Sequence, residues 1–280
     1  MKICLGTANF KKGYGINKYK HNKKSINKIL TLAKIKKIKL LDTAVDYNNN
    51  DMLSKTKDFD VITKLKKLRV YKKEQIKNKI KQQLKHFYSK KKKLYGVLLH
   101  DCNDMRSKKS KYIFECLMDL KRQKVTDKIG ISCYYENDLN ILKTYNFDII
   151  QFPFNLFDQR ILKKKNLLKI KNKEVHVRSI FLQGILLKNN LENHKFFKRW
   201  SSRFKKFNIF IKENKITRLE ASLIFLKQFK FFKYAIVGLE NRNQLNDVIN
   251  TINSKKKYDI KFSKLKSNNE KLLIPFNWKT

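Results

Sequence analysis

The sequence predicts an α/β fold, a single-domain (β/α)8 TIM barrel over residues 1–280. Its length suits one such barrel, which takes roughly 250 residues. Short apolar runs alternate with Lys-rich segments of helical periodicity, and no Pro-, Gly- or Ser-rich linker divides the chain. Hydrophobic residues make up 41% of the chain, enough to bury a core, so global disorder is not expected.

Eight runs are predicted to be strands, because they are rich in β-branched and apolar residues and show little alternation, as strands covered on both faces do. They are residues 2–8, 39–44, 60–64, 95–100, 128–132, 148–152, 174–180 and 234–239. Helical periodicity fills most gaps, at residues 23–37, 71–88, 109–123, 136–144, 159–170, 194–213, 217–230 and 241–252. The gap at 48–58 is too short and too polar for a full helix. This alternation favours a parallel barrel.

The chain carries a formal net charge of +44, from 67 basic and 23 acidic residues. Such a charge normally indicates a nucleic-acid partner. Only nine of the basic residues are Arg, however, and Lys is spread from end to end. A selected phosphate-binding face should cluster its charge and favour Arg, which makes paired hydrogen bonds to phosphate. Because Lys, Asn and Ile have AT-rich codons, we interpret the composition as drift in a biased genome, with weak, salt-sensitive and non-specific nucleic-acid binding.

Four cysteines lie in apolar segments without CxxC spacing, at Cys4, Cys102, Cys116 and Cys133. We expect free, mostly buried thiols in a reducing cytoplasm. No apolar run approaches the roughly 20 residues that span a bilayer. The first run starts as a strand with no signal-peptide core ahead of it. A cytoplasmic monomer or weak oligomer without membrane insertion is therefore expected.

The chain has only seven glycines, and we assign six of them to the C-terminal face of the predicted barrel. These are Gly6, Gly13, Gly15, Gly130, Gly184 and Gly238. Their positions favour the C-terminal face of the barrel, where backbone approaches a ligand or takes a positive φ. The GYG motif at 13–15 is weak as a nucleotide signal, and a flexible loop explains it equally well.

Four residues among the first 100 end or follow predicted strands and carry groups that can move or steady a proton. They are Asp42 in LLDTAVDY, Tyr47 five residues later, Lys64 closing DVITK and His100 closing YGVLLH. The C-terminal ends of parallel strands open on one face of a barrel, so the four can converge. Together they indicate acid–base chemistry on a small polar group. Singly, each has an ordinary alternative as a loop cap, a core edge, a surface charge or a hydrogen-bonded histidine.

These contexts, in this order, resemble the aldo-keto reductases, and the resemblance covers nearly all of the chain. The matching stretches are LGTANFKKGYGI (5–16), LLDTAVDYNNND (40–51), VITKL (61–65), LLHD (98–101), IGIS (129–132), QFPFN (151–155) and VGLENRNQL (237–245). A weaker signal is RSIFLQGILL (178–187), which is similar to reductases encoded with bacterial surface-sugar pathways.

The resemblance implies a role for each of the four residues. Tyr47 is the general acid that protonates the developing alkoxide. Lys64 favours the phenolate, since a nearby cation can lower a pKa by about 1–3 units. Asp42 holds Lys64 in place and keeps it charged, and His100 orients the carbonyl oxygen by hydrogen bonding.

The resemblance also implies a nicotinamide cofactor. Ser132 and Gln151 match residues that hydrogen-bond the carboxamide, although Cys133 stands where an Asn often follows the Ser. Gly6 and Thr7 belong to the first matching stretch and are assigned to the same site.

The phosphate end of the cofactor matches less completely. Asn241 and Gln244 open the helix after the eighth strand, where backbone N–H groups and the helix dipole suit a phosphate. Many members hold the 2′-phosphate of NADP with Lys and Arg, whose positions here are Gly238 and Gln244. Arg242 either substitutes for them or is an exposed surface charge. NADPH is the favoured cofactor, with NADH as the alternative.

Some segments depart from the family pattern, and other polar residues are not assigned to a site. The helix that usually follows the Tyr is shortened to residues 48–58, and the N-terminal hairpin that closes the barrel bottom in many members has no counterpart. Asp104 and Arg106 either touch substrate or, as we favour, lie in a solvated loop. No metal site is expected, because the other histidines show no metal-ligand spacing; they are His21, His86, His176 and His194.

The sequence thus favours NADPH-dependent reduction of an aldehyde or ketone, with Tyr47 as general acid. The first candidate for the small-molecule substrate is a keto- or aldehydo-sugar. One alternative is a drifted, non-catalytic barrel retained as a nicotinamide-binding or interaction protein, which the intact set of four residues disfavours. The other is a basic RNA- or DNA-associated protein, which the dispersed Lys and the lack of aromatic–basic recognition motifs disfavour.

Overall fold

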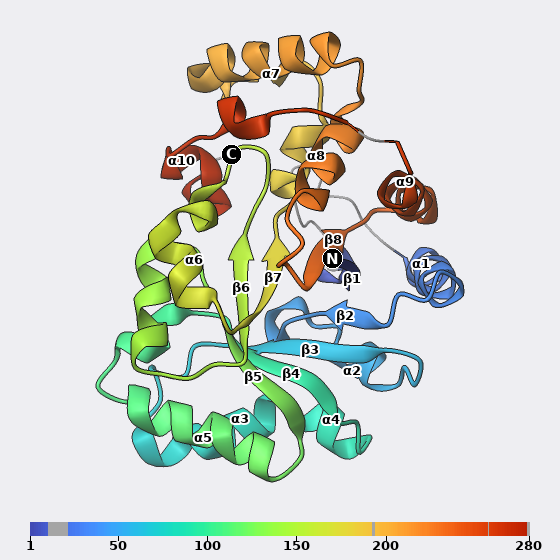
Figure 1. The fold of residues 1–280 in the computed structure, drawn as a ribbon. Coiled ribbons are helices and arrows are strands. Elements are labelled where there is room, and N and C mark those ends of the chain that lie inside the picture. The colour runs from blue at the N-terminus through green and yellow to red at the C-terminus, as the bar shows by residue number, and fades with distance from the viewer. Residues whose placement is uncertain (11–21, 192–193, 257, 279–280) are drawn as a thin grey trace.

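Eight parallel strands close into a barrel in chain order, with the helices arranged around it (Figure 1). The computed structural model describes residues 1–10, 22–191, 194–256 and 258–278. The predicted (β/α)8 barrel is therefore confirmed. The predicted loop with Gly13 and Gly15, together with His21, lies outside the described residues.

The strands occupy the predicted runs, and several end one or two residues earlier than expected. They are β1 (Lys2–Gly6), β2 (Leu40–Asp42), β3 (Asp60–Leu65), β4 (Leu94–Leu99), β5 (Thr126–Ser132), β6 (Ile149–Pro153), β7 (Glu174–Arg178) and β8 (Tyr234–Gly238). The early ends leave the polar residues after each strand in loops at the C-terminal face, where parallel barrels build their sites.

Most helices also follow the prediction. They are α1 (Lys23–Ile35), α2 (Asn50–Ser54), α3 (Lys73–Gln83), α4 (Lys85–Ser89), α5 (Ser110–Arg122), α6 (Lys164–Ile170), α7 (Ser201–Glu213), α8 (Arg218–Lys227), α9 (Arg242–Asn253) and α10 (Glu270–Leu273). The short gap at 48–58 holds only the five residues of α2. The predicted helix at 71–88 divides at Leu84, and the one at 136–144 is the 3-10 helix η4 (Glu136–Lys143). In η4 the Asp138 side chain turns back onto the Tyr134 and Tyr135 N–H groups, which tightens the first turn.

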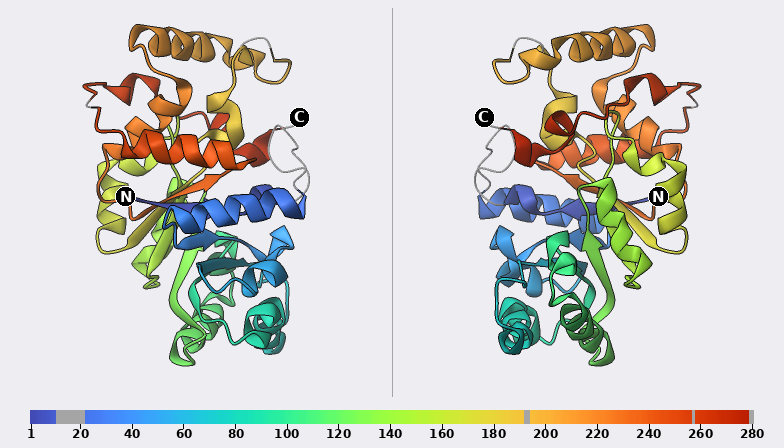
Figure 2. Two further views of the ribbon diagram at one scale, coloured as in Figure 1. Left: turned by 90° about the vertical axis from the view of Figure 1, so that its right-hand side faces the viewer. Right: turned by 90° about the vertical axis from the view of Figure 1, so that its left-hand side faces the viewer.

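The core has two parts. Inside the barrel, apolar side chains from six strands form one cluster, made of Cys4, Leu40, Ile62, Leu98, Ile149 and Ile236. A larger core lies between the strands and the surrounding helices, and on one flank α1 and α9 run side by side (Figure 2). Gly130 is required where β5 meets β6, because a Cβ there would lie 2.5 Å from the Ile149 carbonyl oxygen.

A polar cluster at the N-terminal ends of the strands lies at the bottom of the barrel. Its centre is Glu174, which accepts hydrogen bonds from the Tyr95 hydroxyl (2.6 Å) and from Lys128, and lies 2.8 Å from His176 Nε2. The Tyr234 ring packs edge-on against Tyr95 and His176. Burial alone would raise the pKa of Glu174, but the hydrogen bonds from His176, Lys128 and Tyr95 lower it to about 2. The charged carboxylate is therefore strongly favoured in the folded protein.

All four cysteines are free and buried, as predicted. Within the described part of the chain, no helix is both long enough and apolar enough to cross a bilayer.

Candidate active site

A buried ion pair lies at the C-terminal face of the barrel. Asp42 ends β2 and Lys64 lies near the end of β3, which places Asp42 Oδ1 2.5 Å from Lys64 Nζ. The two side chains are only 6% and 2% exposed. Lys64 also donates to the Thr43 carbonyl oxygen at 3.0 Å. Burial lowers the pKa of Lys64, and the charge and hydrogen bond of Asp42 oppose that shift.

Tyr47 lies above this pair, at the end of the 3-10 helix η2 (Val45–Tyr47) that follows β2. Lys64 Nζ is 5.7 Å from the centre of the Tyr47 ring. The His100 ring approaches the same ring edge-on, with 6.2 Å between the ring centres. The structure thus brings together the four residues that the sequence singled out, Asp42, Tyr47, Lys64 and His100.

His100 has a partner that the sequence analysis missed. His100 Nδ1 lies 3.5 Å from Asp46 Oδ2, and Lys66 Nζ lies 3.1 Å from the other oxygen of the same carboxylate. Hydrogen bonding to His100 is the main reason why the pKa of Asp46 falls to about 2. Burial lowers the pKa of His100, while its hydrogen bond to Asp46 acts in the opposite direction. The only sequence signal for Asp46 was its place beside Tyr47.

Gln151, near the end of β6, connects the ion pair to the centre of the barrel. Its Nε2 donates to Asp42 Oδ2 at 2.8 Å. Its Oε1 is buried and has no hydrogen-bond partner among the described residues. A buried carbonyl oxygen left in this state is an acceptor for a ligand N–H group. Ser132 pairs with Gln151 in the sheet, but it is buried and accepts a hydrogen bond from Arg178 Nε at 3.3 Å.

A hollow of about 280 Å³ opens over these groups, and we call it the central hollow. Among its lining residues are Gly6, Asp42, Tyr47, Lys64, His100, Gln151, Arg178, Gly238, Glu240 and Gln244. Thr7 is not among them, because it is buried and its hydroxyl donates to the Asp42 carbonyl oxygen at 3.0 Å.

The start of α9 forms one wall of the central hollow. Asn241 caps the helix by accepting from the Gln244 N–H at 3.0 Å, and Gln244 Oε1 accepts from the Glu240 N–H at 2.8 Å. Arg242 is exposed and borders a separate hollow between α1 and α9, beside Lys23. Arg242 therefore does not line the central hollow, whereas Glu240 does, and its Oε2 accepts from Gln244 Nε2 at 3.3 Å.

A second hollow of about 570 Å³ adjoins the first, and we call it the side hollow. Tyr47, His100, Tyr134 and Arg178 line both hollows. Other residues line only the side hollow, among them Lys66, Lys67, Asp101, Arg106, Tyr135, Asp138, Pro275 and Phe276. The sequence predicted that the seventh strand continues to residue 180, whereas β7 ends at Arg178, and it gave no reason to choose Arg178.

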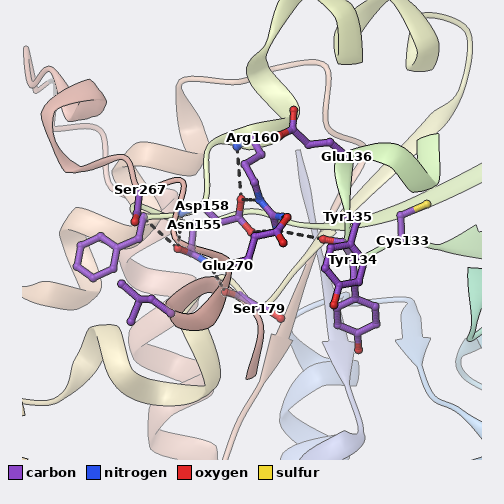
Figure 3. Close-up of polar contacts among 12 residues, drawn as sticks. Cys133, Tyr134, Tyr135, Glu136, Asn155, Asp158, Arg160, Ser179, Ser267 and Glu270 are labelled. Carbon is purple, nitrogen blue, oxygen red and sulfur yellow. Dashed lines mark hydrogen bonds and ion pairs between the residues drawn. The ribbon is translucent and has the colours of Figure 1, made fainter. Parts of the chain in front are cut away.

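Tyr134 and Arg178 form the wall between the hollows. The Arg178 guanidinium lies 3.8 Å from the centre of the Tyr134 ring and donates to the Cys133 carbonyl oxygen at 2.9 Å. Behind them, Arg160 donates to the Tyr134 carbonyl oxygen (3.0 Å) and to Asp158 (2.7 Å), as Figure 3 shows. Buried hydrogen bonds of this kind hold the backbone of Tyr134 in place, and with it the wall between the hollows.

The expectation of a solvated loop at residues 104–106 is wrong for Asp104. Its carboxylate is fully buried and accepts hydrogen bonds from the N–H groups of Leu68 (3.1 Å) and Arg69 (2.9 Å). Two backbone donors in a buried loop need such an acceptor. Arg106 pairs with Asp138 at the side hollow.

Among the residues that the structure describes, one group of side chains has atoms close enough to share a metal ion, namely Cys102, Cys133 and Asp138. The two sulfur atoms are 3.7 Å apart and hydrogen-bonded, and this contact together with burial raises the pKa of the Cys102 thiol. Asp138 already accepts from two backbone N–H groups and pairs with Arg106. Metal binding requires thiolates, so this group does not fit a metal site.

The aldo/keto reductase family model matches residues 2–270, and the chain belongs to that family. It is therefore an oxidoreductase of a family that generally reduces carbonyl groups with NAD(P)H. No curated protein sequence matches the chain.

The solved structures that resemble this fold include aldo-keto reductase AKR11C1 from Bacillus halodurans in its holo form, with 17% identity, a TM-score of 0.70 and coverage of 92% of this chain and 88% of that one. Glycerol dehydrogenase AKR11B4 from Gluconobacter oxydans is similar at 15% identity, with a TM-score of 0.68 and coverage of 92% of this chain and 88% of that one. At these identities the likeness concerns the fold.

Proposed function

We propose that this protein reduces an aldehyde or ketone with hydride from NADPH or NADH, using Tyr47 as the general acid. The observation that carries the proposal is the buried Asp42–Lys64 pair, which lies beneath the Tyr47 ring in a hollow open to ligands. A buried ammonium beside a phenol stabilises the phenolate that remains after proton donation.

Each residue of the site has its own role in the proposed reduction. A reduced nicotinamide cofactor, when bound, would supply hydride to the carbonyl carbon. Tyr47 donates a proton to the carbonyl oxygen, so that an alcohol forms, and recovers its proton from solvent. Lys64, held by Asp42, stabilises the phenolate, and His100 binds the carbonyl oxygen. This division follows the general logic of acid catalysis, in which a positioned donor neutralises charge as it develops.

The central hollow fits the nicotinamide end of the cofactor. The unpartnered Gln151 Oε1 is an acceptor for the carboxamide N–H group. Gly6 and Gly238 line the central hollow, and Asn9 packs against Gly238, where a Cβ would lie 2.6 Å from the Asn9 side-chain oxygen. The N–H groups at the start of α9 suit a phosphate.

NADPH remains the first choice from the family resemblance, but we propose only a small preference over NADH. Arg242 faces another hollow, and Glu240 brings a carboxylate to the edge of the central hollow. A carboxylate repels the 2′-phosphate of NADPH and can accept a hydrogen bond from the 2′-hydroxyl of NADH. The leading substrate is a keto- or aldehydo-sugar.

The test is to titrate the purified protein with each nucleotide and to follow its intrinsic fluorescence. Quenching at or below tens of micromolar is the rough expectation for a dedicated site. A panel of aldehydes and ketones is then assayed by the loss of reduced-nicotinamide absorbance. No response to either nucleotide would favour a barrel kept as an interaction protein.

A further inference from the structure

The side hollow is larger than a small aldehyde requires. Its volume of about 570 Å³ lies within the range of roughly 300–1,000 Å³ that is usual for pockets holding ligands of drug size. Because Tyr47 and His100 line both hollows, a carbonyl group held between them leaves the rest of its molecule in the side hollow.

Aromatic rings form part of its wall. The Tyr134 ring packs against Phe276 with 5.0 Å between ring centres, and Phe276 is 77% exposed. An aromatic side chain so exposed at the rim of a pocket is an available contact for the carbon skeleton of a ligand.

The charges of the side hollow do not cancel. Each of its three carboxylates has a basic partner, in the pairs Asp46–Lys66, Asp101–Arg69 and Asp138–Arg106. Two other lining cations, Lys67 and Arg178, form no ion pair with a carboxylate among residues 1–10, 22–191, 194–256 and 258–278, and Lys67 contributes only a Coulomb attraction to Asp101. The hydrogen-bond acceptors of Arg178 are neutral: Ser132 Oγ, Ser179 Oγ and the Cys133 carbonyl oxygen.

The distribution of Arg separates this hollow from the rest of a Lys-rich surface. Only nine of the 67 basic residues in the chain are Arg. Four of them belong to the side hollow or contact its lining residues. Arg106 and Arg178 line the hollow, Arg69 pairs with Asp101, and Arg160 donates to the Tyr134 carbonyl oxygen. A planar guanidinium is the group that binds carboxylates and phosphates through two parallel hydrogen bonds.

We propose that the side hollow binds a carbonyl substrate that carries an anionic group, a carboxylate or a phosphate ester, held by Arg178 and Lys67. Tyr134 and Phe276 contact the carbon skeleton between that group and the carbonyl. This inference rests on the proposed function and narrows its substrate class.

The test compares matched pairs of substrates under the same conditions. One pair is benzaldehyde and 4-carboxybenzaldehyde, and the other is glyceraldehyde and glyceraldehyde 3-phosphate. A charge-assisted hydrogen bond should raise kcat/KM for the anionic member about 10- to 100-fold. The pair with the larger ratio distinguishes a carboxylate from a phosphate.

Variants connect that ratio to the two cations. Arg178→Gln and Lys67→Met should each reduce the anionic-to-neutral ratio about 10-fold, and Arg178→Lys should reduce it less because the charge is kept. Lys212→Met is the control, because Lys212 is an exposed lysine of α7 that lines neither hollow. It removes one charge from the same total of +44 and should leave the ratio unchanged.

The outcomes separate the inference from the proposed function. If no carbonyl in either pair or in the panel is reduced, the proposed function fails and the inference falls with it. If neutral and anionic members are reduced equally well, the function stands and the inference is wrong. A preference for the anion that survives both Arg178→Gln and Lys67→Met, or that Lys212→Met abolishes, also overturns it. Lys67 is exposed, so its variant keeps the test valid if Arg178→Gln does not fold.

Discussion

Single residues explain why the candidate site can hold a charge inside an apolar barrel. Lys64 is almost fully buried, and an isolated ammonium there would lose its proton. Asp42 and the Thr43 carbonyl oxygen supply the missing partners, and Gln151 in turn supports Asp42. The charge is thus kept by groups from the end of β2, namely Asp42 and Thr43, and from Gln151 of β6.

Tyr47→Phe tests the proposed proton donor. The change removes the hydroxyl but keeps the ring beside Lys64 and His100. Carbonyl reduction should fall by about 10²–10⁴-fold, the usual contribution of general acid catalysis. Nucleotide binding, followed by fluorescence, should survive because the hydroxyl is not one of the proposed cofactor contacts. Turnover close to that of the parent on any carbonyl the parent reduces would remove Tyr47 from its role.

Asp46→Asn tests how His100 binds the carbonyl oxygen. A neutral His100 that donates Nδ1–H to Asp46 presents a bare Nε2, so hydrogen bonding to the substrate requires the protonated ring. Asp46 raises the pKa of His100, against the lowering by burial. Removing that carboxylate should lower the pKa further and move the alkaline fall in kcat/KM to lower pH. An unchanged pH profile would show that protonation of His100 does not limit the reaction.

For single residues, the sequence predicted the site residues that lie at strand ends. It missed the residues whose role depends only on packing in the folded structure. Asp42, Lys64 and His100 each stand at or directly after the end of an apolar run. Asp46 lies in the single turn of η2 and Tyr134 in the loop after β5, where no periodicity marks them. The contact of Asp46 depends on His100, which is distant in the sequence.

Whole elements were predicted well where burial decides them. The strands are continuous apolar runs because helices cover their outer face and the barrel interior covers the other. At residues 136–144 the predicted start was right, but the segment is the 3-10 helix η4, where the Asp138 side chain accepts from the Tyr134 and Tyr135 N–H groups at the first turn. The loops at the C-terminal face are built in the same way, by buried carboxylates that bind backbone N–H groups.

Asp104→Ala tests this construction. The change leaves the N–H groups of Leu68 and Arg69 without their buried acceptor. The free energy of unfolding, measured in urea, should therefore fall by about 1–3 kcal/mol. Asp127→Ala is the control, because Asp127 makes an exposed ion pair with Lys93. That variant should change stability by less than about 1 kcal/mol. Equal effects of the two changes would mean that the loop does not depend on Asp104.

For the whole molecule, the excess of basic residues explains little about function. A net charge of +44 spread along the chain predicts salt-sensitive binding to any polyanion, which says nothing about a substrate. What distinguishes the two ends of the barrel is how their carboxylates are used. At the C-terminal end they hold Lys64 and the backbone N–H groups of loops, and at the N-terminal end Glu174 joins three strands, β4, β5 and β7, through Tyr95, Lys128 and His176.

Glu174→Gln tests whether that cluster stabilises the fold. Because the pKa of Glu174 is about 2 in the folded protein and 4.5 in an unfolded reference, its contribution is fully present above pH 4.5. It is lost as the pH falls from 4.5 towards 2, where both states become protonated. Urea unfolding should therefore show that the variant is less stable than the parent at pH 7. The difference in their free energies of unfolding should narrow steadily towards pH 3. Glu115→Gln is the control, because Glu115 is an exposed glutamate of α5, and it should change the free energy of unfolding at pH 7 by less than about 1 kcal/mol. If the difference in free energy of unfolding between Glu174→Gln and the parent stays constant with pH, the shape of the Glu174 side chain stabilises the fold and its charge does not.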